Sequence, residues 1–196
     1  MLYSEQIKNQ KLVARCMMQD LSKHFGQEAI VAGGAPRDWF RGMPAKDLDI
    51  YINVPQGTDT MELKEVLETG SEGVPPTVHR RTANNPYIYD EFTSNHIMDV
   101  FDYVSMGDLV QLVVTDIDPV AVMKSFPINL SRAMYIRTGD GTGVSVFEDC
   151  FMRGMNEKSI VAMNRNYHLD YVTRIMEKFQ DFTWHPYNGF GERRYT

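Results

Sequence analysis

Two aspartates are the first residues in the chain whose spacing indicates chemistry. Residues 47–52 read DLDIYI, in which charged or polar positions alternate with apolar ones. This alternation is typical of a half-buried β-strand, on which Asp47 and Asp49 project from the same face. Adjacent carboxylates repel each other, and each raises the pKa of the other. A cation removes that cost, and Mg²⁺ prefers one or two carboxylates together with substrate phosphates.

A glycine pair upstream supplies the complementary part of such a site. Gly33-Gly34 follows the apolar run 29–32, and residues 35–40 can form one or two helical turns. Glycine lets the backbone come close to a ligand, and a helix start offers free N–H groups to a phosphate. The stretch therefore predicts a strand, a glycine turn, a short helix and a second strand. This arrangement suits phosphoryl or nucleotidyl transfer with two metal ions.

These short patterns together resemble the signature of a known superfamily. Residues 33–38 read GGAPRD and residues 47–49 read DLD, whereas G-x-G-x-x-G and the P-loop pattern are absent from the chain. The two segments resemble the G-G-x-x-R-D and D-x-D motifs of the polymerase-β superfamily of nucleotidyltransferases. The branch they resemble most is that of class II CCA-adding enzymes and bacterial poly(A) polymerases. The resemblance implies the α/β nucleotidyltransferase fold, of α+β type, in which helices flank a mixed sheet.

The resemblance also implies a set of catalytic carboxylates. Asp47 and Asp49 would bind two Mg²⁺ ions, and a third carboxylate would lie on a neighbouring strand. Residues 97–104, IMDVFDYV, offer Asp99 and Asp102 for this position. We take Asp99 as the third catalytic and metal-binding residue, because apolar residues flank it directly as in the family pattern. Asp102 stays as the alternative.

Further residues would contact the nucleotide. Arg37 resembles the family arginine, whose planar guanidinium suits a triphosphate, and Asp38 would orient Arg37 or a ribose. Residues 124–129, KSFPIN, resemble the family's R-D-F-T-I-N, but Ser125 and Pro127 replace its Asp and Thr. The predicted nucleotide-binding residues are Gly33, Gly34, Arg37, Asp38, Lys46, Asn129 and Arg132.

One later segment departs from the family. Glu148-Asp149 precedes Arg153 by one residue more than the family's base-reading motif E-D-x-x-R requires. We interpret this match as a coincidence.

The remaining pattern predicts one domain, residues 1–196, with residues 136–196 as a C-terminal helical extension. A helical stripe of apolar residues ends at Gly26. Strands around Ile30, Leu48, Val100 and Leu112 should form one sheet. Pro119 suits the first position of a helix. We expect this helix and the N-terminal one to cover the same face of the sheet.

Composition restricts the class of protein. The chain has 196 residues, of which 43% are hydrophobic, so it is long enough for a real core. Its net charge of −6 argues against broad non-specific RNA binding, although not against a local basic groove. The two cysteines form no spacing pattern, and no apolar run reaches membrane length. We therefore expect a cytoplasmic protein without a membrane partner; the oligomeric state stays open.

The first functional interpretation is a Mg²⁺-dependent nucleotidyltransferase. It would move a nucleoside monophosphate from a nucleoside triphosphate (NTP) to an acceptor hydroxyl. The favoured NTPs are ATP and CTP, and the favoured acceptor is an RNA (tRNA) 3′ end. The alternatives are a toxin-like nucleotidyltransferase acting on a protein or small molecule, and a non-catalytic nucleotide- or RNA-binding relative. The retained D-x-D favours an enzyme.

The range after residue 135 is too short for the helical regions with which CCA-adding enzymes hold tRNA. Weak RNA affinity is therefore expected. In this respect the chain resembles short stand-alone proteins encoded by bacteriophages.

Overall fold

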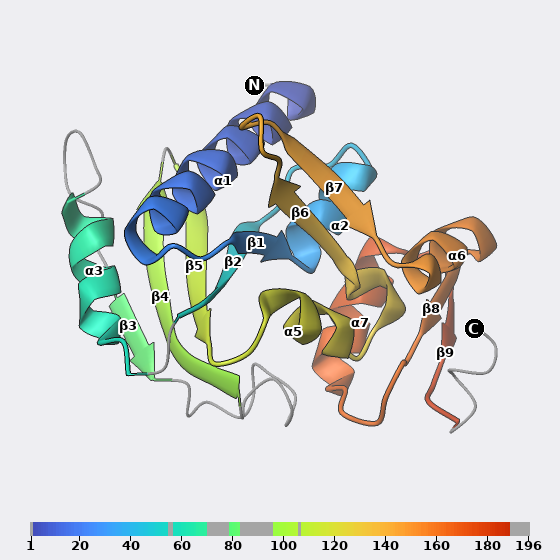
Figure 1. Ribbon diagram of the computed structural model, residues 1–196. Coiled ribbons are helices and arrows are strands. Elements are labelled where there is room, and N and C mark those ends of the chain that lie inside the picture. The colour runs from blue at the N-terminus through green and yellow to red at the C-terminus, as the bar shows by residue number, and fades with distance from the viewer. Residues whose placement is uncertain (1, 55–56, 70–78, 83–95, 106, 189–196) are drawn as a thin grey trace.

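A seven-stranded mixed sheet forms the centre of the protein (Figure 1). The computed structural model describes residues 2–54, 57–69, 79–82, 96–105 and 107–188. The strands, in the spatial order β3-β4-β5-β2-β1-β6-β7, are β1 (Ala29–Ala32), β2 (Asp47–Asn53), β3 (His79–Thr82), β4 (Ile97–Ser105), β5 (Asp108–Thr115), β6 (Ala133–Arg137) and β7 (Gly143–Phe147). Strands β2 and β5 pair in parallel, and the other neighbours pair antiparallel. This arrangement confirms the predicted mixed α/β class and the four predicted central strands.

The helices are α1 (Tyr3–Phe25), α2 (Gly34–Phe40), α3 (Thr60–Thr69), α5 (Pro119–Ser125), α6 (Asp149–Glu157) and α7 (Leu169–Lys178). The predicted end of the first helix is confirmed, because Gly26 takes a left-handed conformation with φ of 64° and its N–H donates to the Ser22 carbonyl. Such a cap favours glycine, which has no Cβ to clash. Among the described residues, no helix combines the length and hydrophobicity that a membrane span requires.

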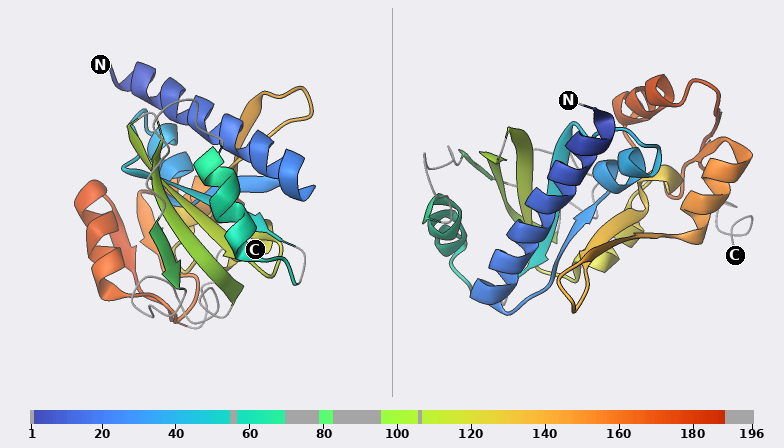
Figure 2. Two further views of the ribbon diagram at one scale, coloured as in Figure 1. Left: turned by 90° about the vertical axis from the view of Figure 1, so that its left-hand side faces the viewer. Right: turned by 90° about the horizontal axis from the view of Figure 1, so that it is seen from above.

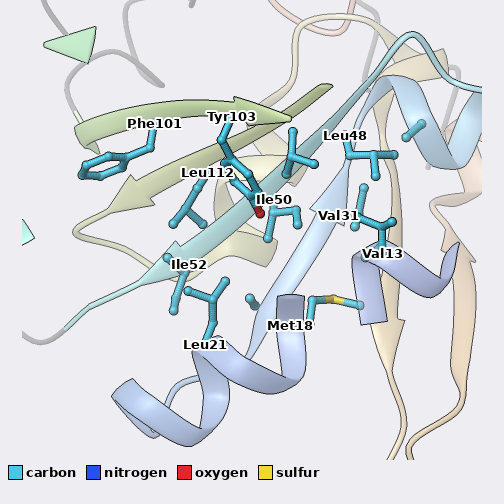
Figure 3. Packing of buried hydrophobic residues seen from close by; sticks show 14 of the residues in the cluster. Val13, Met18, Leu21, Val31, Leu48, Ile50, Ile52, Phe101, Tyr103 and Leu112 are labelled. Carbon is cyan, nitrogen blue, oxygen red and sulfur yellow. The ribbon is translucent and has the colours of Figure 1, made fainter. Parts of the chain in front are cut away.

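Helix α1 covers one face of the sheet. Its apolar residues Met18 and Leu21 pack with Ile50 and Ile52 of β2, and all four are almost fully buried (Figure 3). Buried residues of α2 and α3 join the same cluster. Burial of each such side chain stabilises the fold by about 1.5–3 kcal/mol relative to exposure, so this cluster holds β2 firmly.

Helix α5 covers the opposite face. Its residues Val122 and Met123 pack with Tyr51 of β2 and Val113 of β5. The expectation that α1 and α5 cover the same face is therefore wrong. Side chains alternate along a strand, so the Tyr51 side chain lies on the other side of the sheet from Ile50 and Ile52.

The C-terminal range packs beside the β6 and β7 end of the sheet, far from β3 and α3 (Figures 1 and 2). Residues 136–196, predicted as a helical extension, include the end of β6, all of β7, helices α6 and α7, and two short parallel strands, β8 (Ser159–Val161) and β9 (Thr183–His185). The extension is thus not purely helical. Its core joins Ile128 and Ile160 to Val172 and Phe179.

Candidate functional site

A cavity of about 380 Å³ opens between the start of α2, strand β2 and helix α7. Its first wall contains six residues of the sequence-predicted site, namely Gly33, Gly34, Arg37, Lys46, Asp47 and Asp49. Its second wall consists of residues that the sequence did not single out, namely Asn166, His168, Asp170, Tyr171, Arg174 and Lys178. The volume is in the range of small-molecule binding pockets.

The carboxylates of Asp47 and Asp49 lie on one face of β2, and both are half-buried. Burial, together with the negative charges of Asp47 and Asp102, raises the pKa of Asp49 to about 7, while Arg37 opposes this shift. Among the described residues, no group of three or more His, Cys, Asp or Glu side chains is arranged to hold a metal ion by itself. A cation at the two aspartates would therefore need further ligands from a substrate or water.

The structure separates Asp99 from this pair and brings Asp102 to it. Asp102 pairs in register with Gln111, and Gln111 pairs with Asp49, so the three side chains share one face. The Gln111 amide donates to Asp102 Oδ1 over 2.7 Å.

Asp99 instead pairs with Val114 on the face that α1 covers, where it is buried and its Oδ1 accepts the Val100 N–H over 2.9 Å. The placement contradicts the expectation for Asp99. An odd spacing along one strand puts two side chains on opposite faces.

Arg37 lines the cavity and also carries a buried hydrogen-bond donor that has no partner among the described residues. Its guanidinium is 4% exposed, and Nε donates to Asp38 Oδ1 over 2.9 Å. Its Nη1 has no hydrogen-bond partner in the described part of the chain. A buried unsatisfied donor is costly, and an anion in the cavity would satisfy it. Arginine is suited to phosphate because it presents several N–H groups in one plane.

The glycine turn beside Arg37 disfavours a larger residue at Gly33. Gly33 has φ of 81°, and a Cβ there would lie 3.3 Å from the Phe126 ring. At Gly34 a Cβ would lie 3.6 Å from Arg37 Nη2. The positive φ and the close Phe126 ring therefore favour glycine at position 33, whereas a Cβ at position 34 would make an ordinary contact.

Solved structures of known proteins share this arrangement of strands and helices. A CCA-adding enzyme in complex with CTP has a TM-score of 0.62 at 16% sequence identity, covering 94% of this chain and 42% of that one. A tRNA-processing enzyme in an apo form has a TM-score of 0.62 at 14% identity, covering 90% and 44%. The Thermotoga maritima CCA-adding enzyme complexed with tRNA has a TM-score of 0.60 at 16% identity, covering 88% and 38%. The fold is similar to that of CCA-adding enzymes.

The chain spans less than half the length of each of these three proteins. No protein-family model matches it, and no curated protein sequence does. The likeness at this identity concerns the fold, and the chemistry has to be argued from the cavity itself.

Three of the predicted nucleotide-binding residues do not line the cavity. Asp38 is buried in ion pairs, with Oδ1 accepting from Arg37 and Oδ2 from Lys178 Nζ over 2.7 Å. The Nε of Arg132 donates to the Phe126 carbonyl over 3.0 Å. Asn129 is fully buried. Asp38 thus connects Arg37 to Lys178 of α7.

Asn129 holds the C-terminal range in place instead of facing a nucleotide. Its amide donates to the Cys150 and Ser159 carbonyls over 3.3 and 3.2 Å, and its Oδ1 accepts the Val161 N–H over 2.8 Å. These bonds connect α6 and β8 to the turn that follows α5. The match to the family motif marks a structural residue in this chain, which contradicts the prediction.

Replacing Asn129 by Leu is expected to lower the free energy of unfolding by about 3 kcal/mol, because buried carbonyl and N–H groups lose their partners. Urea denaturation of the purified variant measures this value. Asn166→Leu is the matched control, since Asn166 is exposed at the cavity rim and should change stability little. Equal stability of both variants would contradict the structural role of Asn129.

The second wall of the cavity lies on the polar side of α7. Asp170, Arg174 and Lys178 follow each other at intervals of four residues and so share one side of the helix. Val172 and Ile175 are buried on the apolar side. This charged stripe is the signal in the sequence that could have identified the wall. Glu148, Asp149 and Arg153, the residues compared above with the base-reading motif E-D-x-x-R, are not part of the described lining.

Proposed function

We propose that this protein is a Mg²⁺-dependent nucleotidyltransferase that moves a nucleoside monophosphate from an NTP to an acceptor hydroxyl. One observation carries the proposal. Two adjacent carboxylates, Asp47 and Asp49, line the same cavity as Arg37, whose buried Nη1 has no hydrogen-bond partner in the part of the chain that the structure describes. The first group attracts a cation and the second an anion, and a Mg²⁺–triphosphate complex presents both charges at once.

The donor set fits Mg²⁺. Asp47 and Asp49 supply two carboxylates, and burial with the charges of Asp47 and Asp102 raises the pKa of Asp49 to about 7, so a bound cation would favour its ionised form. We assign Asp102, in place of Asp99, as the third carboxylate of this face. When bound, Mg²⁺ would lower the pKa of the acceptor hydroxyl and stabilise charge on the triphosphate, as two ions do in related chemistry.

The protein groups position the triphosphate. Arg37 Nη1 donates to a phosphate oxygen, the backbone at Gly33 and Gly34 allows its close approach, and exposed Lys46 neutralises charge at the rim. The acceptor oxygen then forms a bond to the α-phosphorus while the bond to the bridging oxygen breaks. Pyrophosphate leaves, and the acceptor hydroxyl gives its proton to solvent water. Positioning and charge stabilisation account for catalysis in reactions of this class.

We assign base recognition to α7. Asp170 offers acceptors and Arg174 offers donors on the wall that faces the carboxylates. Cytosine and adenine both present an exocyclic amino donor beside a ring nitrogen acceptor, which complements an Asp and Arg pair. ATP and CTP are therefore the proposed substrates. Solved CCA-adding enzymes of this fold bind these same two nucleotides.

Replacing Arg174 by Ala is expected to reduce discrimination against UTP and GTP by about tenfold, because one of the base-reading groups is lost. Incorporation kinetics with each of the four NTPs measure the ratio of kcat/KM values. Arg165→Ala is the control, since Arg165 stacks over Tyr187 and does not belong to the described lining. An unchanged ratio in Arg174→Ala would remove α7 from base recognition.

An RNA 3′ end is the proposed acceptor, supported by the tRNA complex of a protein with this fold. The test is incubation of the protein with Mg²⁺, each labelled NTP and a pool of RNA, followed by mapping of the labelled nucleotide. Labelling of a protein or a small molecule instead would contradict the RNA acceptor and support the alternative, a toxin-like nucleotidyltransferase. NTP binding without any labelled product would indicate a non-catalytic relative.

A further inference from the structure

Gln10 is a buried polar residue in the middle of the otherwise amphipathic α1. It is 1% exposed, and its side-chain amide makes four hydrogen bonds. The Oε1 atom accepts the Trp39 Nε1–H and the Ala45 N–H, each over 2.9 Å. The Nε2 atom donates to the Ala45 carbonyl over 2.8 Å and to Asp108 Oδ1 over 2.9 Å. An amide of this kind has two donor hydrogens and two acceptor sites, so all of its capacity is used.

These four bonds converge on the segment that leads into the carboxylate strand. Ala45 is held through both of its backbone groups, as if by a neighbouring strand, although residues 41–46 belong to no strand or helix. Lys46 follows directly and lines the cavity, and Asp47 comes next. The position of the Ala45 backbone therefore determines where β2 begins.

The Asp108 bond fixes the neighbouring strand at the same level. Asp108 opens β5, and the next residue, Leu109, is the in-register partner of Asp47. Gln10 thus connects the starts of both β2 and β5 from the helix above them. The Trp39 bond extends the connection to α2, which begins at the glycine turn of the cavity. One side chain ties together the elements that carry Lys46, Asp47 and Arg37.

We infer that Gln10 is a positioning residue, which sets the location of Asp47 and Lys46 by holding the Ala45 backbone. It does not contribute to the cavity lining and acts through that backbone. The catalytic consequence rests on the proposed function, because Asp47 and Lys46 act there on the metal and the triphosphate. The backbone consequence does not depend on it.

The test compares Gln10→Met with Trp39→Phe. Methionine has similar length and volume but neither donates nor accepts strong hydrogen bonds, so all four bonds are lost. Trp39→Phe removes one bond to Oε1 and leaves both bonds to Ala45. In Gln10→Met we expect faster hydrogen exchange at the amides of residues 45–47, and a kcat lower by about 10- to 100-fold with the KM for NTP unchanged within about twofold. In Trp39→Phe we expect neither change.

A second variant keeps the test decisive if Gln10→Met fails to fold. Gln10→Glu combined with Asp108→Asn exchanges donor and acceptor between these two side chains and keeps the Trp39 and Ala45 N–H bonds. It loses the donation to the Ala45 carbonyl, so exchange at residues 45–47 and kcat should change in the same direction but less. Unchanged exchange in a folded Gln10 variant would overturn the inference. If the wild type is active, a Gln10 variant with faster exchange at residues 45–47 but an unchanged kcat would also overturn it.

Failure of the proposed function gives a different result. In that case the wild-type protein neither binds Mg²⁺ with a non-hydrolysable NTP analogue in calorimetry nor transfers nucleotide. Hydrogen exchange at residues 45–47 then still decides whether Gln10 holds the Ala45 backbone.

Discussion

Replacing Asp47 by Asn is expected to lower the rate of nucleotidyl transfer by about 10³-fold or more, because a charged ligand to the metal is lost in the transition state. The change removes a charge but almost no volume, and Asp47 is only half-buried. The fold should therefore stay intact. Single-turnover kinetics at saturating NTP measure the rate, and the thermal midpoint of unfolding checks the fold.

The two candidates on β4 provide the matched comparison for Asp47. Asp102 shares its face with Asp49, so Asp102→Asn should lower the transfer rate by about 10²-fold. Asp99 lies on the opposite face and bonds the Val100 N–H, so Asp99→Asn should affect stability more than rate. A folded Asp99→Asn without activity, beside an active Asp102→Asn, would contradict the assignment of the third carboxylate.

The sequence predicts the local elements of this fold well. The alternation of residues 47–52, the Gly33-Gly34 pair and Pro119 at a helix start each depend on a few neighbouring residues. The structure confirms β2, the start of α2 and the start of α5 at Pro119, where Asp118 Oδ1 accepts the Val120 N–H over 3.0 Å. Each of these features is decided by short-range hydrogen bonds and side-chain alternation, which a sequence pattern records directly.

The sequence did not decide which face of the sheet a side chain joins. Asp99 and Asp102 lie on one strand and both are flanked by apolar residues, so pattern alone does not distinguish them. Their faces follow from the register of β4 with β5 and of β5 with β2. The placement of α5 opposite α1 follows from the same alternation, seen at Ile50 and Tyr51.

The second wall of the cavity depends on contacts between distant parts of the chain. Lys178 of α7 reaches Asp38 of α2 over 2.7 Å, across 140 positions of sequence. Tyr171 and Ser131 form a hydroxyl–hydroxyl hydrogen bond that attaches the same helix beside the sheet. No local pattern reports such pairings, so the sequence predicted a C-terminal helical extension but did not place α7 at the site.

Replacing Asp49 by Asn is expected to abolish transfer and at the same time to stabilise the free protein at pH 8. Burial, Asp47 and Asp102 raise the pKa of Asp49 from 3.8 to about 7 in the folded state. Between these values the folded protein holds a proton that the unfolded chain releases. The stabilising contribution of that proton is therefore complete below about pH 4 and is lost as the pH rises through about 7.

Asparagine stays neutral throughout this range and so avoids the repulsion that ionised Asp49 meets above pH 7. The midpoint of thermal unfolding of Asp49→Asn should exceed that of the wild type by about 5 °C at pH 8, and the difference should vanish near pH 4. Calorimetry across this pH range measures it. Asp20→Asn, on the exposed side of α1, is the control and should show no such trend.

Addition of Mg²⁺ and NTP distinguishes the destabilisation caused by ionised Asp49 in the free protein from the stabilisation that bound ligand provides. Ligand that binds only the folded state raises its stability, so the wild type should gain stability at pH 8 whereas Asp49→Asn gains much less. A variant that is less stable than the wild type at pH 8 would show that Asp49 is held by favourable partners. The accumulated negative charge of the free site would then no longer support a cation between Asp47 and Asp49.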